Sequence, residues 1–163
     1  MPRQRIRLTI CFGDLDAALR SSARGMALNP GDPNLQVNRA LALGFDSSFG
    51  EASELLSQAQ RLEPLPPLWF AEFKGVIAFA EARYEETLAG VEPIDAAWDK
   101  MYALACYGHL GRPERAKALL EQLNHTGRSP DWMCGVARQP FRDPRVRDRL
   151  REGVQLALSW GNT

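Results

Sequence analysis

Residues 33–64 read PNLQVNRALALGFDSSFGEASELLSQAQRLEP, and this stretch decides the fold. It contains two segments with apolar residues at steps of three and four, joined by a short turn at residues 44–48 and closed by Pro64. Pro30 stands 34 positions before Pro64, and the preceding residues match in kind, since Ala18 aligns with Ala52. A period of about 34 residues that ends in Pro is typical of stacked helix-turn-helix units. The sequence therefore predicts an all-α fold.

The same period divides the chain into four units, but it is irregular. Tyr84 follows Phe49 by 35 positions, whereas Pro113 follows Tyr84 by only 29. The second helix of the third unit should therefore be short, and Pro93 should end it. After residue 127 the period is lost, and a final helix beginning near Pro144 should cap the last apolar face. The expected single domain, residues 1–163, comprises repeats at about 1–32, 33–66, 67–95 and 96–127, and a cap at 128–163.

Each unit should contain two helices. Proline and the glycine-rich or polar turns place the ends of these helices. The predicted helices cover residues 14–28, 34–43, 49–62 and 68–81, a short segment from Tyr84, then 97–110, 113–124, a short 132–138, and the capping helix from 143 or 144.

The N-terminal segment, residues 3–12, supports two readings. Ile6, Leu8, Ile10 and Phe12 alternate with polar residues or Cys, as in a half-buried strand. The repeat register instead requires a helix there, and we favour the helix. Because the first repeat would begin just before Met1, the register also leads us to expect an upstream region.

Composition limits the classes of function. Hydrophobic residues make up 45% of the chain and charged residues 25%, which is ordinary for a globular domain. Twenty basic residues balance twenty acidic ones, so net charge gives no support to nucleic-acid binding. No apolar run is long enough to span a membrane. Three cysteines without paired spacing fit reduced thiols, and we expect a cytoplasmic protein.

The small and aromatic positions resemble the tetratricopeptide repeat. The second unit carries Ala40, Phe49, Ala52, Ala59 and Pro64 at positions where that family has small residues, an aromatic and Pro. The third and fourth units match in part. The resemblance covers roughly residues 3–124 and implies a right-handed superhelical solenoid of antiparallel helix pairs.

A second resemblance lies in the C-terminal half. The order Leu110-Gly111-Arg112-Pro113, then Gln139-Pro140-Phe141-Arg142-Asp143-Pro144, is similar to the C-terminal repeat region of bacterial class III adenylate or guanylate cyclases and winged-helix regulators. That resemblance implies an upstream catalytic or DNA-binding domain. None of the cyclase's metal or nucleotide residues occurs in this chain.

In the tetratricopeptide class the first helix of each pair lines a concave groove. Counting from the register predicts an apolar, aromatic groove that would suit a partner peptide or helix. The alternative is that its two tryptophans pack between repeats or beneath the cap. The predicted groove residues are Val37, Leu41, Phe45, Trp69, Glu72, Phe73, Val76, Phe79, Trp98, Met101, Tyr102 and His109.

Six arginines between residues 138 and 151 suggest a basic edge. Arg142, Arg145 and Arg149 are the candidates for docking an acidic surface. The alternative is a solvated helix face with local ion pairs, such as Asp148 with Arg151. Neither His109 nor His125 has partners at metal-ligand spacing, and no catalytic triad or phosphate loop is suggested.

These observations predict a non-catalytic protein-interaction module without a cofactor. It would bind a protein or peptide, a second copy of the chain, or a neighbouring domain through the groove. The alternative is a regulatory or oligomerisation region of a nucleotide cyclase or a transcriptional regulator.

Overall fold

The computed structural model describes residues 14–125 and 131–161, and within these ranges the chain forms helices and no strand. The predicted all-α fold is therefore confirmed for the described residues. The two readings for residues 3–12 lie outside them. Each expected helix in the described ranges is present, with ends within two residues of the prediction: α2 (Leu15–Leu28), α3 (Pro33–Phe45), α4 (Phe49–Leu62), α5 (Leu68–Ala80), α6 (Tyr84–Val91), α7 (Ala97–His109), α8 (Pro113–His125), α9 (Trp132–Ala137) and α10 (Pro144–Gly161).

Aspartate side chains mark the starts of several helices. Asp14 accepts a hydrogen bond from the Ala17 N–H at 2.8 Å, and Asp32 accepts one from the Asn34 N–H at 2.8 Å. Asp131 does the same for the Cys134 N–H at 2.9 Å. Each carboxylate satisfies an N–H group that has no partner inside its own helix.

The turns inside three successive helix pairs have the same backbone geometry. Ser47, Ala82 and Gly111 all adopt a left-handed conformation, with φ of 68°, 60° and 63°. In each turn the next residue's N–H reaches back to a carbonyl in the last turn of the preceding helix: Ser48 to Leu43, Arg83 to Ala78 and Arg112 to Tyr107, each at 2.9 Å. This is the hydrogen bond of a Schellman C-cap. The α3–α4, α5–α6 and α7–α8 pairs are thus built alike.

The first and second helices of these pairs differ in burial. Helices α3, α5 and α7 are buried over most of their length, because other helices cover more than one of their faces. Helices α2, α4 and α8 each bury three residues fully, and their other residues are partly buried or exposed. In α4 the three are Ala52, Leu55 and Ala59. The core therefore lies along α3, α5 and α7.

The short helix α6 packs closely on α5. It has eight residues and ends two positions before Pro93, as the contracted interval predicts. A Cβ atom on Gly90 would lie 2.3 Å from the Ala71 carbonyl oxygen, and one on Gly75 would lie 3.0 Å from the Thr87 carbonyl oxygen. These positions must be small for the two backbones to approach.

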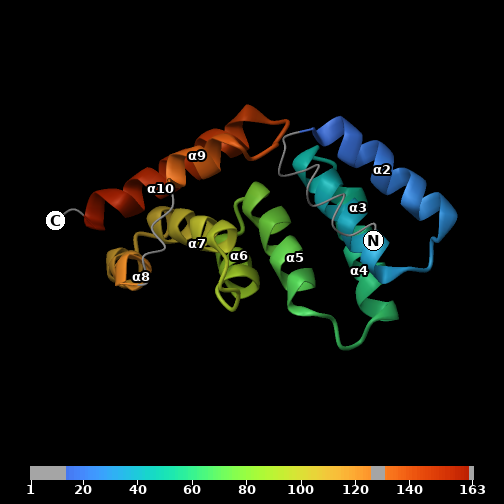
Figure 1. The fold of residues 1–163 in the computed structure, drawn as a ribbon, viewed down its shortest axis with the longest axis horizontal. Coiled ribbons are helices and arrows are strands. Elements are labelled where there is room, and N and C mark those ends of the chain that lie inside the picture. Colours follow the sequence, from blue (N-terminus) through green and yellow to red (C-terminus); the bar gives the residue numbers. More distant parts are fainter. Residues whose placement is uncertain (1–13, 126–130, 162–163) are drawn as a thin grey trace.

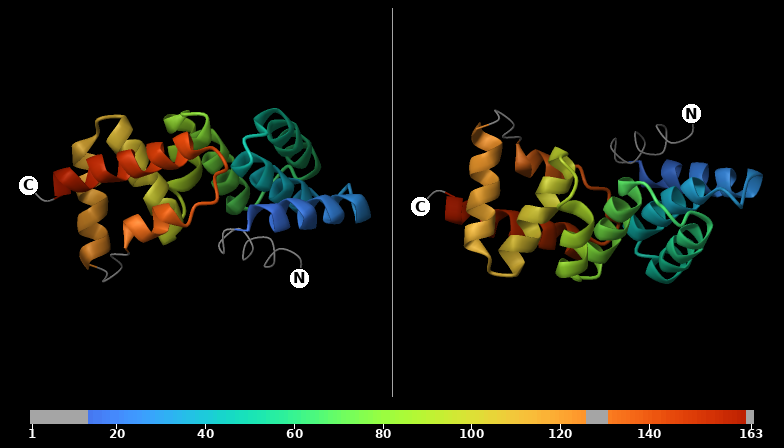
Figure 2. Two further views of the ribbon diagram at one scale, coloured as in Figure 1. Left: turned by 90° about the horizontal axis from the view of Figure 1, so that it is seen from above. Right: turned by 90° about the horizontal axis from the view of Figure 1, so that it is seen from below.

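The helices form an elongated arrangement, with α2–α4 at one end and α8 and the C-terminal part of α10 at the other (Figure 1). Helix α10 runs beside α7 and makes its most extensive contact there. Viewed from above, the connection between α9 and α10 reaches the blue and teal helices α2 and α3 (Figure 2). The C-terminal segment thus contacts both ends of the helical array.

Candidate partner-binding groove

The predicted groove residues come together on α3, α5 and α7, but most of them are buried. Trp69, Trp98 and His109 are half-buried. The others are at most 2% exposed: Val37, Leu41, Phe45, Glu72, Phe73, Val76, Phe79, Met101 and Tyr102. These side chains lie in the interior of the structure and have almost no surface open to solvent.

An uninterrupted row of aromatic contacts joins α5 to α7. Trp69 packs edge-on against Phe73, with ring centroids 5.3 Å apart, and Phe73 packs against Trp98 at 6.3 Å. Trp98 contacts Tyr102 at 5.4 Å, and Tyr102 contacts Phe79 at 5.3 Å. Edge-to-face pairs of this kind add to the stabilisation from burial. The row links α5 to α7 through side-chain contacts.

The chain's own α9–α10 linker, residues 138–143, contacts three of the predicted groove residues, Phe45, Trp98 and Tyr102. The Gln139 side-chain oxygen accepts hydrogen bonds from Trp98 Nε1 and from the Tyr102 hydroxyl, both at 2.9 Å. Its amide nitrogen donates to the Gly135 carbonyl at 3.1 Å, which holds the side chain in this orientation. Burial, together with the nearby negative charge of Asp99, raises the pKa of Tyr102, so its hydroxyl remains a donor.

Phe141 extends the same interaction to α3. Its ring lies 4.7 Å from the ring of Phe45, and it is only 3% exposed. The N–H of Arg142 donates to the Phe45 carbonyl at 2.9 Å. The linker therefore makes both side-chain and backbone hydrogen bonds with the groove, as an extended bound peptide does.

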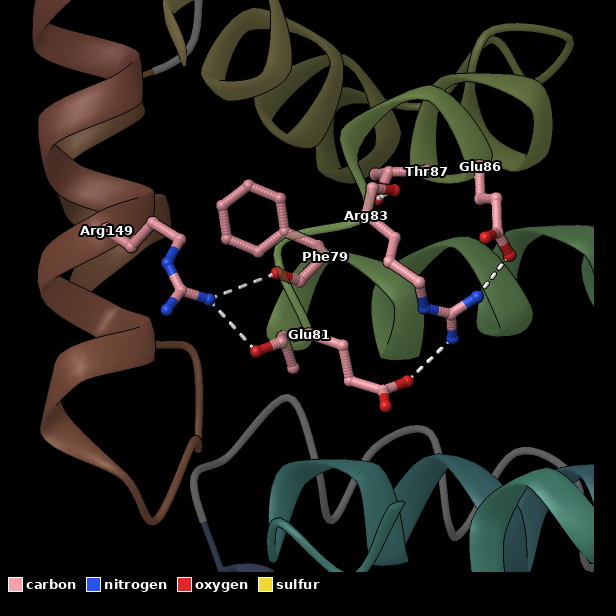
Figure 3. A network of polar contacts seen from close by, with 7 residues as sticks. Phe79, Glu81, Arg83, Glu86, Thr87 and Arg149 are labelled. Carbon is pink, nitrogen blue, oxygen red and sulfur yellow. Dashed lines mark hydrogen bonds and ion pairs between the residues drawn. The ribbon is translucent and has the colours of Figure 1, made fainter. Parts of the chain in front are cut away.

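Helix α10 contacts the end of α5 through Arg149 (Figure 3). The Arg149 guanidinium donates to the carbonyl oxygens of Ala80 at 3.0 Å and Phe79 at 3.5 Å, which are among the last carbonyls of α5. A cation at this position also interacts favourably with the helix dipole. His109 Nε2 lies 2.7 Å from the Arg149 carbonyl oxygen and its ring stacks on Tyr84, at 4.8 Å between centroids.

The three arginines of the predicted basic edge all have partners within the chain. Arg142 forms ion pairs with Asp16 and Asp46, and Arg145 pairs with Asp143 at 2.8 Å. Arg149 binds the end of α5, as described above. The anticipated local pair of Asp148 with Arg151 is present at 2.7 Å. Docking of an acidic partner on this edge remains a prediction, and such a partner would compete with these internal contacts.

Sequence reasoning missed the two linker residues that enter the groove, Gln139 and Phe141, and the glycine pair at the α7–α10 crossing. A Cβ atom on Gly108 would lie 2.1 Å from the Gly153 carbonyl oxygen, and one on Gly153 would lie 2.5 Å from the Ala105 carbonyl oxygen. An apolar Phe between two prolines, preceded by Gln, was the available signal.

A hollow of about 240 Å³ lies between α7, α8 and the end of α6. The Tyr107 hydroxyl donates to the Glu92 carboxylate there at 2.5 Å, and Lys100 donates to the Glu92 carbonyl at 3.2 Å. No residue of the predicted groove lines this hollow, so the two are separate features.

Within residues 14–125 and 131–161, no three His, Cys, Asp or Glu side chains come together where they could hold a metal ion. In the same part of the chain, no helix has both the length and the apolar character needed to cross a membrane. No protein-family model, curated protein or solved structure matches this chain.

Proposed function

We propose that this chain is a non-catalytic protein-interaction module that binds an extended segment of a partner through the groove along α3, α5 and α7. The partner is another protein, a second copy of the chain or a neighbouring domain. In this proposal the helices form four tetratricopeptide-like pairs in a right-handed superhelix, followed by a C-terminal cap. The shared geometry of the turns at Ser47, Ala82 and Gly111 supports the repeat interpretation.

The observation that carries the proposal is the way the groove holds Gln139. Trp98 and Tyr102 direct two donors at one side-chain oxygen, and Phe45 provides an aromatic surface for a second side chain. Large aromatic residues with a polar group give most of the binding energy in many interfaces. A surface that accommodates an extended segment of its own chain has the chemistry to accommodate one from a partner.

A selection from a peptide library displayed on phage, with the purified chain as target, tests the proposal. Selected peptides should bind the wild type and lose at least about tenfold in affinity to Trp69→Ala, since Trp69 is a half-buried ring at the start of α5. Trp160→Ala is the matched control, because Trp160 is also half-buried but lies on α10. Peptides that bind all three proteins equally would argue against the groove.

A second candidate function is the regulatory tail of a nucleotide cyclase or transcriptional regulator. The supporting observation is that Arg142, in the segment that carries this resemblance, joins α2 and α3 to the C-terminal helices through Asp16 and Asp46. A tail that holds two catalytic domains in place needs such rigidity. The gene sequence upstream of Met1 tests it. An in-frame cyclase or winged-helix domain would support the tail, and an in-frame stop codon would exclude it.

A further inference from the structure

The linker is a short non-helical segment, and a few of its residues make its contacts with the groove. It lies between the end of α9 at Ala137 and the start of α10 at Pro144, and it is not helical. Pro140 lacks an N–H and cannot continue a helix. Gln139 and Phe141 provide its buried contacts, whereas the Arg142 side chain that fixes it to α2 and α3 is 52% exposed. Exposed ion pairs contribute little and are weakened by salt.

The groove also defines what kind of segment it accepts. Two donors converge on the Gln139 oxygen while its amide nitrogen donates to the Gly135 carbonyl, so this place suits a side-chain amide, which both accepts and donates hydrogen bonds. Two residues later an aromatic ring packs on Phe45. The next residue is a cation between two aspartates, Asp16 and Asp46.

From these contacts we infer that the α9–α10 linker is an intramolecular ligand that competes with the partner, and that the partner carries an extended segment with the same chemistry: a side-chain amide, an aromatic residue two positions later, and then an arginine. This inference rests on the proposed function. Because the linker is covalently attached, its effective concentration at the groove is high. The apparent affinity for a partner is therefore reduced by the fraction of molecules whose groove is closed.

Fluorescence anisotropy with a labelled synthetic peptide of residues 137–143, Ala-Arg-Gln-Pro-Phe-Arg-Asp, tests the inference on the full chain. The double variant Gln139→Ala, Phe141→Ala should bind this peptide at least about tenfold more tightly than the wild type, because its own linker no longer fills the site. Gln139→Ala alone should give a smaller gain and serves if the double variant does not fold. In either variant the peptide should raise the melting temperature.

Two further variants locate the binding. Tyr102→Phe, added to the linker variant, removes one of the two donors and should weaken peptide binding several-fold. Tyr107→Phe is the matched control, because this tyrosine is on the same helix but its hydroxyl binds Glu92, outside the groove. Peptides with Gln replaced by Glu, Phe by Ala or Arg by Glu should each bind less tightly.

Equal affinity of wild type and linker variants for the peptide, or no binding by a folded linker variant, would overturn the inference. So would peptide binding that Tyr102→Phe and Tyr107→Phe weaken equally. If the linker variant instead forms dimers and ignores the peptide, the groove accepts a second copy of the chain and the inference is wrong. In these cases the proposed function still stands if library peptides of another sequence bind the wild type and lose affinity to Trp69→Ala.

Discussion

At the scale of single residues, the two glycines at the α7–α10 crossing, Gly108 and Gly153, carry the strongest steric requirement at the interface of α10. Gly153→Ala would place a methyl group 2.5 Å from the Ala105 carbonyl oxygen, which belongs to a helix backbone and cannot move away cheaply. We expect a loss of about 1–3 kcal/mol in the free energy of unfolding, measured by urea denaturation. Gly50→Ala is the control, since no atom lies within 4 Å of its added Cβ. Equal effects of the two substitutions would contradict the close crossing.

The buried thiol of Cys106 should make the stability of the protein depend on pH. Burial raises the pKa of its thiol from 9.0 to about 12. The folded state therefore keeps this thiol protonated up to a higher pH than the unfolded chain does. As pH rises from about 9 toward 12, the thiol ionises first in the unfolded chain, and the free energy of unfolding should fall. Below that range this contribution is fully present. Tyr102, whose pKa is also raised, adds to the loss at the upper end.

Urea unfolding of the wild type and Cys106→Ala at several pH values between about 8 and 11 measures the contribution of the thiol. The wild type should lose stability more steeply above about pH 9 than the variant, whatever the difference between them at neutral pH. Parallel curves for the two proteins would mean that Cys106 is not protected from ionisation in the folded state.

At the scale of the elements, replacing Ala by Gly should have opposite effects on stability in a turn and inside a helix. Ala82 is exposed and has a positive φ, so Ala82→Gly relieves an unfavourable backbone conformation and should stabilise the protein by about 1 kcal/mol. Ala89→Gly, at an exposed position inside α6, should destabilise it by a similar amount. Thermal unfolding of the two variants measures both effects. Destabilisation by Ala82→Gly would contradict the turn geometry.

The helices could be predicted because their signals are local. The apolar periodicity of residues 49–62 predicts α4, and proline and glycine mark the ends of the neighbouring helices within a few residues. A short stretch of sequence is therefore sufficient to predict each helix. The contacts of the α9–α10 linker could not be predicted in this way. Gln139 binds Trp98 across 41 positions, and Arg142 binds Asp16 across 126. No period in the sequence encodes contacts between a repeat and the non-repeating segment that folds back onto it.

At the scale of the whole molecule, the linker joins the two ends of the array. Helix α2 packs mainly on α3, and Arg142 connects both to the C-terminal helices through Asp16 and Asp46. These ion pairs are exposed and add little to the total stability. Their effect should instead be local, by restricting the opening of α2 relative to the other helices.

Hydrogen exchange followed by mass spectrometry should therefore show faster exchange in α2 for Arg142→Ala, with α7 unchanged. The difference should shrink at about 1 M salt, since exposed charges are then screened over a few ångströms. A double-mutant cycle of Arg142→Ala with Asp46→Ala should show coupling at low salt. The matched cycle of Arg145→Ala with Asp46→Ala should show none, because Arg145 pairs with Asp143. Equal coupling in both cycles, or faster exchange throughout the chain, would mean that Arg142 affects general stability or net charge rather than the connection between the two ends.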